Sequence, residues 1–134
     1  MNQIILASHS KLASGMALTV QFFGGMPVVV LEQTMDDSGF EGKVVEVLER
    51  YKDKNCIVFT DLLGGSVNQI FSKYLSKYNF HLITGMNLSI ILECMFTQQD
   101  IDANFIRQAM SASKLQFAYM NDYLVQVSND DEDE

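Results

Sequence analysis

A histidine, an aspartate and a glycine-rich segment could do chemistry together in this chain. His9 is one of two histidines, and Asp61 stands just before the segment Gly64-Gly65-Ser66. A carboxylate that binds one nitrogen of an imidazole fixes its tautomer and leaves a lone pair on the other nitrogen. Two glycines and a serine before a helix let backbone amides and a hydroxyl approach an anion closely. These residue types indicate a histidine nucleophile beside a phosphoryl-binding loop, provided that the fold brings them together.

The segments that carry these residues alternate between two kinds of apolar spacing. Short apolar runs predict four strands that are buried on both faces, at residues 3–8, 26–32, 55–60 and 80–84. Apolar residues then recur every three or four positions after each run, as at Leu12, Met16 and Val20, and this spacing predicts helices. A fifth helix is expected at residues 101–110, and residues 115–119 are expected to form a last, antiparallel edge strand.

This alternation predicts an α/β fold with a mostly parallel sheet, because parallel neighbours need crossover connections and helices are the usual crossover. We expect a doubly wound sheet of the flavodoxin-like order 2-1-3-4, with helices on both faces. In that order the first and third strands are neighbours, and ligands bind in the crevice at their carboxyl ends. His9 follows the first strand and residues 61–66 follow the third. We therefore expect the two groups to meet at this crevice.

The composition limits the number of domains and the kinds of partner that the chain can have. With 134 residues, 48% of them hydrophobic, the chain is expected to form one domain over residues 1–120, followed by an acidic, frayed tail over residues 121–134. The formal net charge of -8 argues against nucleic acid as a partner. No apolar run approaches the roughly 18 residues of a membrane span, so we expect no membrane insertion.

The remaining thiols and the second histidine are expected to be structural. Cys56 and Cys94 lie far apart without Cys-x-x-Cys spacing, and His81 lies inside the fourth predicted strand. The sequence thus predicts no metal site and no cofactor. Because the N-terminus lacks the features of a secretion signal, we expect a cytoplasmic protein.

Three motifs in order resemble one known family. They are Ile-Leu-Ala-Ser-His-Ser at residues 5–10, Asp-Leu-Leu-Gly-Gly-Ser-Val-Asn at residues 61–68, and Ile-Thr-Gly-Met-Asn-Leu at residues 83–88. Together they resemble the mannose-family IIA domain of the bacterial phosphoenolpyruvate:sugar phosphotransferase system, over residue 3 to about residue 118. One departure is Val67, where the family loop usually has proline.

The resemblance implies a phosphohistidine relay for sugar uptake. His9 would accept a phosphoryl group from the phosphocarrier HPr and pass it to a IIB component, and through it to the membrane components IIC and IID. Asp61 would hold Nδ1 of the ring, so that Nε2 is the phosphorylated atom. The resemblance and the loop chemistry place the phosphoryl oxygens among Ser10, Gly64, Gly65 and Ser66.

Partners that reach His9 need a shallow and partly apolar rim. The candidate partner-contacting residues are Leu62, Leu63 and Met86. Resemblance also implies a homodimer through the C-terminal strand at residues 115–119. The transported sugar and the identity of the IIB partner stay open, because the sugar contacts belong to the membrane components.

The residues of the predicted site are also compatible with two other functions. The phosphotransfer subunit of dihydroxyacetone kinase also has a Ser-His-Ser segment, but it lacks the Asp-Leu-Leu-Gly-Gly-Ser pattern seen here at residues 61–66. A regulatory binding module could be phosphorylated on the same histidine. A receiver-like domain needs an acidic pair after the first strand, where this chain has Ser8-His9-Ser10.

Overall fold

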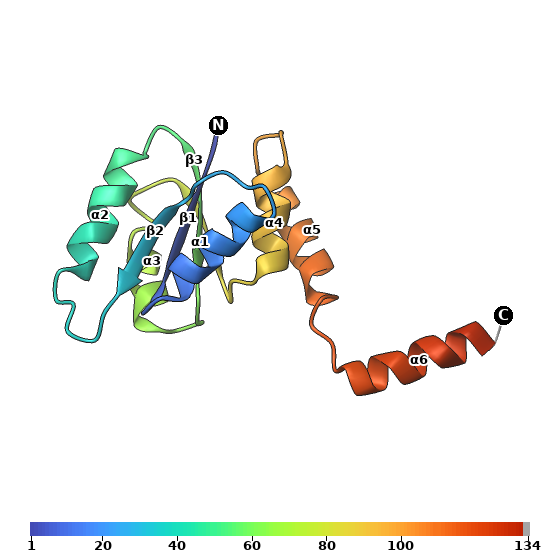
Figure 1. Ribbon diagram of the computed structural model, residues 1–134. Coiled ribbons are helices and arrows are strands. Elements are labelled where there is room, and N and C mark those ends of the chain that lie inside the picture. The colour runs from blue at the N-terminus through green and yellow to red at the C-terminus, as the bar shows by residue number, and fades with distance from the viewer. Residues whose placement is uncertain (133–134) are drawn as a thin grey trace.

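Four parallel strands form one sheet in the order β2-β1-β3-β4, with helices on both faces (Figure 1). The computed structural model describes residues 1–132. The strands are β1 (Asn2–His9), β2 (Val29–Gln33), β3 (Asn55–Thr60) and β4 (Phe80–Thr84). The helices are α1 (Leu12–Phe22), α2 (Phe40–Arg50), α3 (Ser66–Lys73), α4 (Leu88–Phe96), α5 (Ala103–Lys114) and α6 (Met120–Glu132). The predicted α/β class and strand order are confirmed.

The central strands are apolar on both faces because each face is covered by a separate core. Successive side chains of a strand point to opposite faces. Ile4 and Leu6 therefore pack with residues of α1, α4 and α5, whereas Ile5 and Ala7 pack with residues of α2 and α3. Burial on two faces explains why β1 reads as a continuous apolar run rather than an alternating one.

The register brings three strand ends to one edge of the sheet. His9 at the end of β1 pairs with Gln33 at the end of β2, and Ala7 pairs with Thr60 at the end of β3. Because all strands are parallel, the loops after β1, β2 and β3 meet at this edge. The second strand begins at Val29, later than expected, because Pro27 has no N–H to donate to a strand pairing.

The expected C-terminal edge strand at residues 115–119 is wrong. Leu115 and Gln116 form the turn that ends α5, and their backbone N–H groups donate hydrogen bonds to the carbonyls of Ala112 and Ser113. Helix α6 follows and projects from the body (Figure 1), so the expected frayed tail is helical as far as Glu132, and residues 133–134 lie outside the described residues. The reason is the spacing of Met120, Tyr123, Leu124 and Val127, which is helical.

Within residues 1–132, no helix is both long enough and apolar enough to span a bilayer.

Candidate active site

The Asp61 carboxylate holds His9 at two points. Its Oδ2 atom accepts a hydrogen bond from the backbone N–H of His9 at 2.8 Å and lies 2.9 Å from Nδ1 of the ring. Its Oδ1 atom accepts from the N–H of Leu62 at 3.0 Å. An ionised carboxylate only accepts hydrogen bonds, so the ring proton lies on Nδ1. In the neutral ring, Nε2 is then the atom with a free lone pair.

Asp61 is ionised because His9 stabilises its charge. The Asp61 side chain is 8% exposed. Burial alone would raise the pKa of Asp61, but hydrogen bonds from the amide and the ring of His9, with its Coulombic attraction, lower the pKa below its ordinary value. At neutral pH the carboxylate therefore carries the charge that fixes the histidine tautomer.

The free nitrogen of His9 faces Ser66. Ser66 is the first residue of α3, and its Oγ lies 3.1 Å from Nε2 of His9. The His9 side chain is 40% exposed and lines an open crevice with Ser66, so a reactant from solvent can reach the ring. The ring is thus held on its inner side by a carboxylate and open on its outer side beside a hydroxyl.

The start of α3 adds positive potential at the same place. The first hydrogen bond of the helix runs from the N–H of Gln69 to the carbonyl of Gly65, the residue before α3, at 2.9 Å. The N–H groups of the first helical residues precede that bond and have no intrahelical acceptor. Such amides, together with the helix dipole, favour an anion beside Ser66.

The other predicted phosphoryl-binding residues use their amides within the protein. Gly64 N–H donates to Oδ1 of Asn68 at 3.2 Å, and Gly65 N–H donates to the carbonyl of Leu62 at 3.1 Å. Ser10 N–H donates to the carbonyl of Gln33 at 2.9 Å. The φ values of Ser10 and Gly64 are +53° and +78°. The structure brings all of them to the site, where they shape the two loops, and the hydroxyl of Ser66 is the group that lies at Nε2.

A crevice of about 530 Å³ opens at His9. Its walls include Lys11 from the turn after β1, Gln33 from the end of β2, and Met35 from the loop that follows. Gln33 and Met35 are not among the site residues predicted from the sequence. The available signal was their position directly after a strand whose carboxyl end lies beside that of β1.

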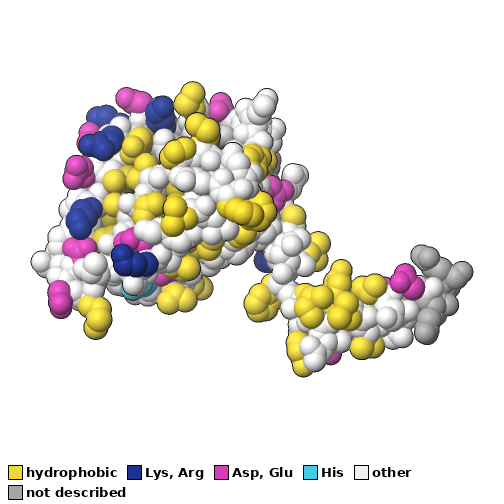
Figure 2. Space-filling view, in the orientation of Figure 1, with side chains coloured by type: hydrophobic (Ala, Val, Ile, Leu, Met, Phe, Trp, Pro, Cys, Tyr) yellow, Lys and Arg dark blue, Asp and Glu magenta, His cyan; other side chains and the backbone are white. Residues whose placement is uncertain are grey.

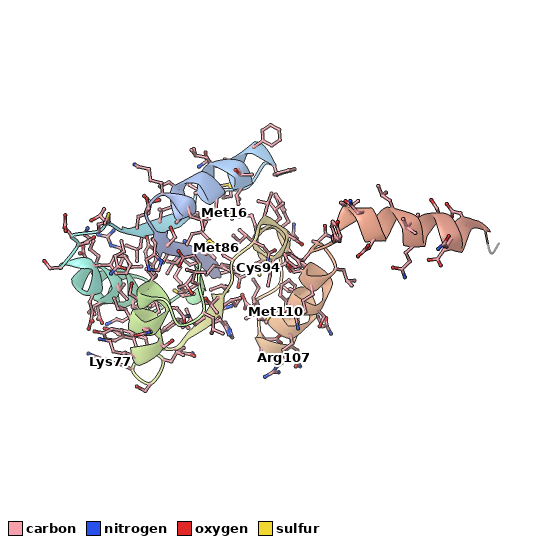
Figure 3. All side chains as sticks on the ribbon, turned by 90° about the horizontal axis from the view of Figure 1, so that it is seen from below. Met16, Lys77, Met86, Cys94, Arg107 and Met110 are labelled. Atoms are coloured by element: carbon pink, nitrogen blue, oxygen red, sulfur yellow. The ribbon has the colours of Figure 1, made fainter. Side chains whose placement is uncertain are left out.

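The rim of the site differs from the prediction in one residue. Leu62 and Leu63 are 62% and 85% exposed, as a partner-contacting rim requires. Met86 as a partner-contacting residue is wrong, because it is 9% exposed and packs in the core. Figure 3 shows its side chain inside the body with Met16 and Cys94. Met35, which is fully exposed, takes its place at the crevice.

The residues expected to be structural lie away from His9. His81 is in the middle of β4, where it pairs with Ile57. Cys56 and Cys94 are buried free thiols, and burial raises the pKa of both, that of Cys94 to about 12. Among the described residues, no three His, Cys, Asp or Glu side chains are grouped as a metal site would require.

Comparisons with known proteins identify the family and support the fold. Residues 3–110 match the family described as PTS system fructose IIA component. The IIA protein associated with the fucose utilization operon from Streptococcus pneumoniae is 25% identical, with a TM-score of 0.80 over 92% of this chain and 96% of that one.

Two further structures share the fold. The mannose/sorbose specific IIA subunit from Enterococcus faecalis is 18% identical, with a TM-score of 0.81 over 88% of this chain and 93% of that one. The phosphotransferase component EIIA from Streptococcus agalactiae is 21% identical, with a TM-score of 0.77 over 90% of this chain and 98% of that one. No curated protein sequence matches significantly. The family match covers most of the sequence, and the chain therefore belongs to the mannose-type IIA family of the phosphotransferase system.

Proposed function

We propose that this protein carries a phosphoryl group on Nε2 of His9, taking it from phosphorylated HPr and passing it to a IIB component. The observation that carries the proposal is the unequal state of the two ring nitrogens. Nδ1 is held by Asp61 at 2.9 Å, whereas Nε2 is accessible and lies 3.1 Å from the Ser66 hydroxyl. An imidazole held in this way is a nucleophile with one defined attacking atom.

The transfer exchanges one bond for another. The Nε2 lone pair attacks phosphorus while the bond from phosphorus to the donor histidine of HPr breaks, and the donor nitrogen keeps that electron pair. The His9 ring gains positive charge as the new bond forms, and the Asp61 carboxylate stabilises that charge through Nδ1–H. Transfer to the IIB component runs the same exchange in reverse, with His9 as the leaving group.

The phosphoryl oxygens need donors while the transition state is loose. The Ser66 hydroxyl and the first amides of α3 are in place to donate to them. Positioning and these hydrogen bonds supply the catalysis in this proposal, which invokes no metal or cofactor.

Both partners must bring their reacting atoms to one exposed nitrogen. Leu62, Leu63 and Met35 are large exposed apolar residues in the loops around His9. We propose that HPr and the IIB component dock on them in turn, since apolar side chains commonly form the centre of a protein interface. These partners work in the cytoplasm in this system, and we place the protein there with them.

We also propose that the protein forms a homodimer, now without the strand that the sequence predicted. Helix α6 exposes Met120, Tyr123, Leu124 and Val127. Figure 2 shows hydrophobic side chains gathered along this projecting helix. A monomer would leave this apolar stripe in water. Light scattering on the full chain tests the assembly, and a monomeric mass across the concentration range would contradict it.

The function is tested by reconstitution with enzyme I, HPr and phosphoenolpyruvate that carries the radioactive label in its phosphoryl group. We expect acid-labile, alkali-stable label on the wild type and on the control variant His81→Ala, and none on His9→Ala. Circular dichroism verifies that each variant is folded. Label that persists on His9→Ala would assign the phosphoryl group to another residue, and label that no IIB component removes would contradict the relay.

A further inference from the structure

One residue of β2 contacts both loops that enclose His9. The backbone carbonyl of Gln33 accepts from Ser10 N–H at 2.9 Å, and its side-chain Oε1 lies 2.5 Å from Oγ of Ser66. Gln33 also pairs with His9 in the register of β1 and β2. The side chain of Gln33 is therefore the next group in a chain of hydrogen bonds that runs from Asp61 through His9 to Ser66.

The Ser66 hydroxyl cannot donate a hydrogen bond to both of its neighbours in this series at the same time. Ser66 has a single hydroxyl hydrogen, which can go either to Nε2 of His9 or to Oε1 of Gln33. If Gln33 presents its oxygen, the hydroxyl points away from Nε2 and turns a lone pair toward it. That arrangement suits a protonated Nε2, which cannot attack phosphorus.

The amide of Gln33 can resolve this conflict because it has two different ends. If its NH₂ group faces Ser66, it donates to Oγ, and the hydroxyl hydrogen is free for Nε2. After transfer, the same hydrogen is free for a phosphoryl oxygen. A carboxylate in this place would accept only, and would hold the hydroxyl in the unsuitable direction.

We propose that Gln33 is a positioning residue that aims the Ser66 hydroxyl at the reacting atoms by presenting the NH₂ end of its amide to Oγ. This inference rests on the proposed function, because it assigns Gln33 a part in phosphoryl transfer at His9. Gln33 acts through Ser66 and forms no bond to phosphorus.

Two variants of the same length separate the contributions of the amide. Gln33→Glu keeps the acceptor and removes the donor, and Gln33→Met removes both. We expect the single-turnover rate from saturating phospho-HPr to fall by about tenfold in Gln33→Glu and by about fivefold in Gln33→Met, the size that one misdirected hydrogen bond implies. The control is Gln3→Met, a partly buried glutamine at the far end of β1, which we expect to stay within about twofold.

A double-mutant cycle tests whether Gln33 acts through Ser66. In a Ser66→Ala background, Gln33→Met should cause no further loss of rate, because no hydroxyl remains to aim. Losses that multiply in the double variant would overturn the proposal, as would wild-type rates in both single variants. A general structural defect would also slow Gln3→Met or change the circular dichroism.

Ring ¹⁵N NMR of the unphosphorylated protein gives a readout that does not depend on transfer. Gln33→Glu should move the Nε2 resonance of His9 toward the protonated form, relative to wild type and Gln3→Met. An unchanged resonance would contradict the proposal. If the wild type takes no label from phospho-HPr, the proposed function fails on its own, while ¹⁵N spectra of Gln33→Glu with and without Ser66→Ala still report whether Gln33 acts on His9 through Ser66.

Discussion

Gly65 lies so close to the His9 ring that a side chain at this position would press on the ring. A Cβ atom added to Gly65 would lie 3.1 Å from Cε1 of the ring and 3.3 Å from Cβ of Leu62. The φ of Gly65 is -67°, which any residue adopts, so the restriction is steric. The absent side chain lets the start of α3 reach the reactive nitrogen.

This contact predicts that Gly65→Ala displaces the His9 ring and leaves the fold intact. We expect the rate of phosphoryl transfer from phospho-HPr to fall by about tenfold, since small misplacements of reacting atoms are costly. Gly42→Ala is the matched control, because Gly42 lies in α2 with nothing within 4 Å of the added Cβ. Equal rates for the two variants would show that the ring has room to move.

Asp61→Ala is expected to slow transfer without abolishing it. The variant loses the charge that stabilises the ring during attack and the acceptor that fixes its tautomer, whereas Nε2 and Ser66 remain. We expect a loss of about 100-fold in the single-turnover rate. An unaltered rate would remove the orienting role from Asp61, and complete loss of label would give the carboxylate a larger one.

Asp61 also predicts how stability depends on pH. Because the pKa of Asp61 is lower in the folded protein, its contribution is fully present above the unfolded value of about 3.9 and is lost as pH falls through the folded pKa. Wild type should therefore exceed Asp61→Asn in free energy of unfolding at pH 7, and the difference should shrink below about pH 4. Urea unfolding at pH 7, 4 and 3 measures this. A difference that grows toward low pH would contradict the direction of the shift.

Thr60 and Thr84 are register partners at the ends of β3 and β4, and they predict opposite effects of the same substitution. Thr60 Oγ1 accepts from Nδ2 of Asn68 at 3.1 Å, whereas the buried Oγ1 of Thr84 has no partner among the described residues. We expect Thr60→Val to lower the free energy of unfolding by about 1 to 3 kcal/mol and Thr84→Val to raise it by about 1 kcal/mol. Denaturant unfolding compares them, and destabilisation by Thr84→Val would mean that its hydroxyl is hydrogen-bonded after all.

The fold was predictable because burial leaves a periodic trace in the chain. Residues 4–7 are apolar without interruption because β1 is covered on both faces, and that pattern distinguishes a central parallel strand. The meeting of His9 and Asp61 then followed from strand order alone, although 52 positions separate them.

Two predictions were wrong at apolar residues whose sequence pattern fits more than one structure. Met86 looked like an exposed loop residue, but Gly85 at φ +80° turns the chain, and Met86 N–H bonds to the carbonyl of Thr60 at 3.0 Å, with the side chain in the core. Leu115, Phe117 and Tyr119 alternate with other residues as in a strand, but Leu115 lies in the turn after α5 and the other two follow that turn without regular structure. All three side chains are exposed. Neither the burial of Met86 nor the irregular segment after α5 is marked by a regular spacing of apolar residues in the sequence.

By itself, the sequence determined the α/β class, the strand order and the family, because apolar spacing and ordered motifs are properties of the linear chain. Only the tertiary structure decided that Oδ2 of Asp61 takes both the amide and the ring of His9, and that Gln33 stands next to Ser66. The reason is that a hydrogen bond depends on a few tenths of an ångström. Register, turn geometry and packing set distances on that scale, and residue spacing reports only which face a side chain occupies.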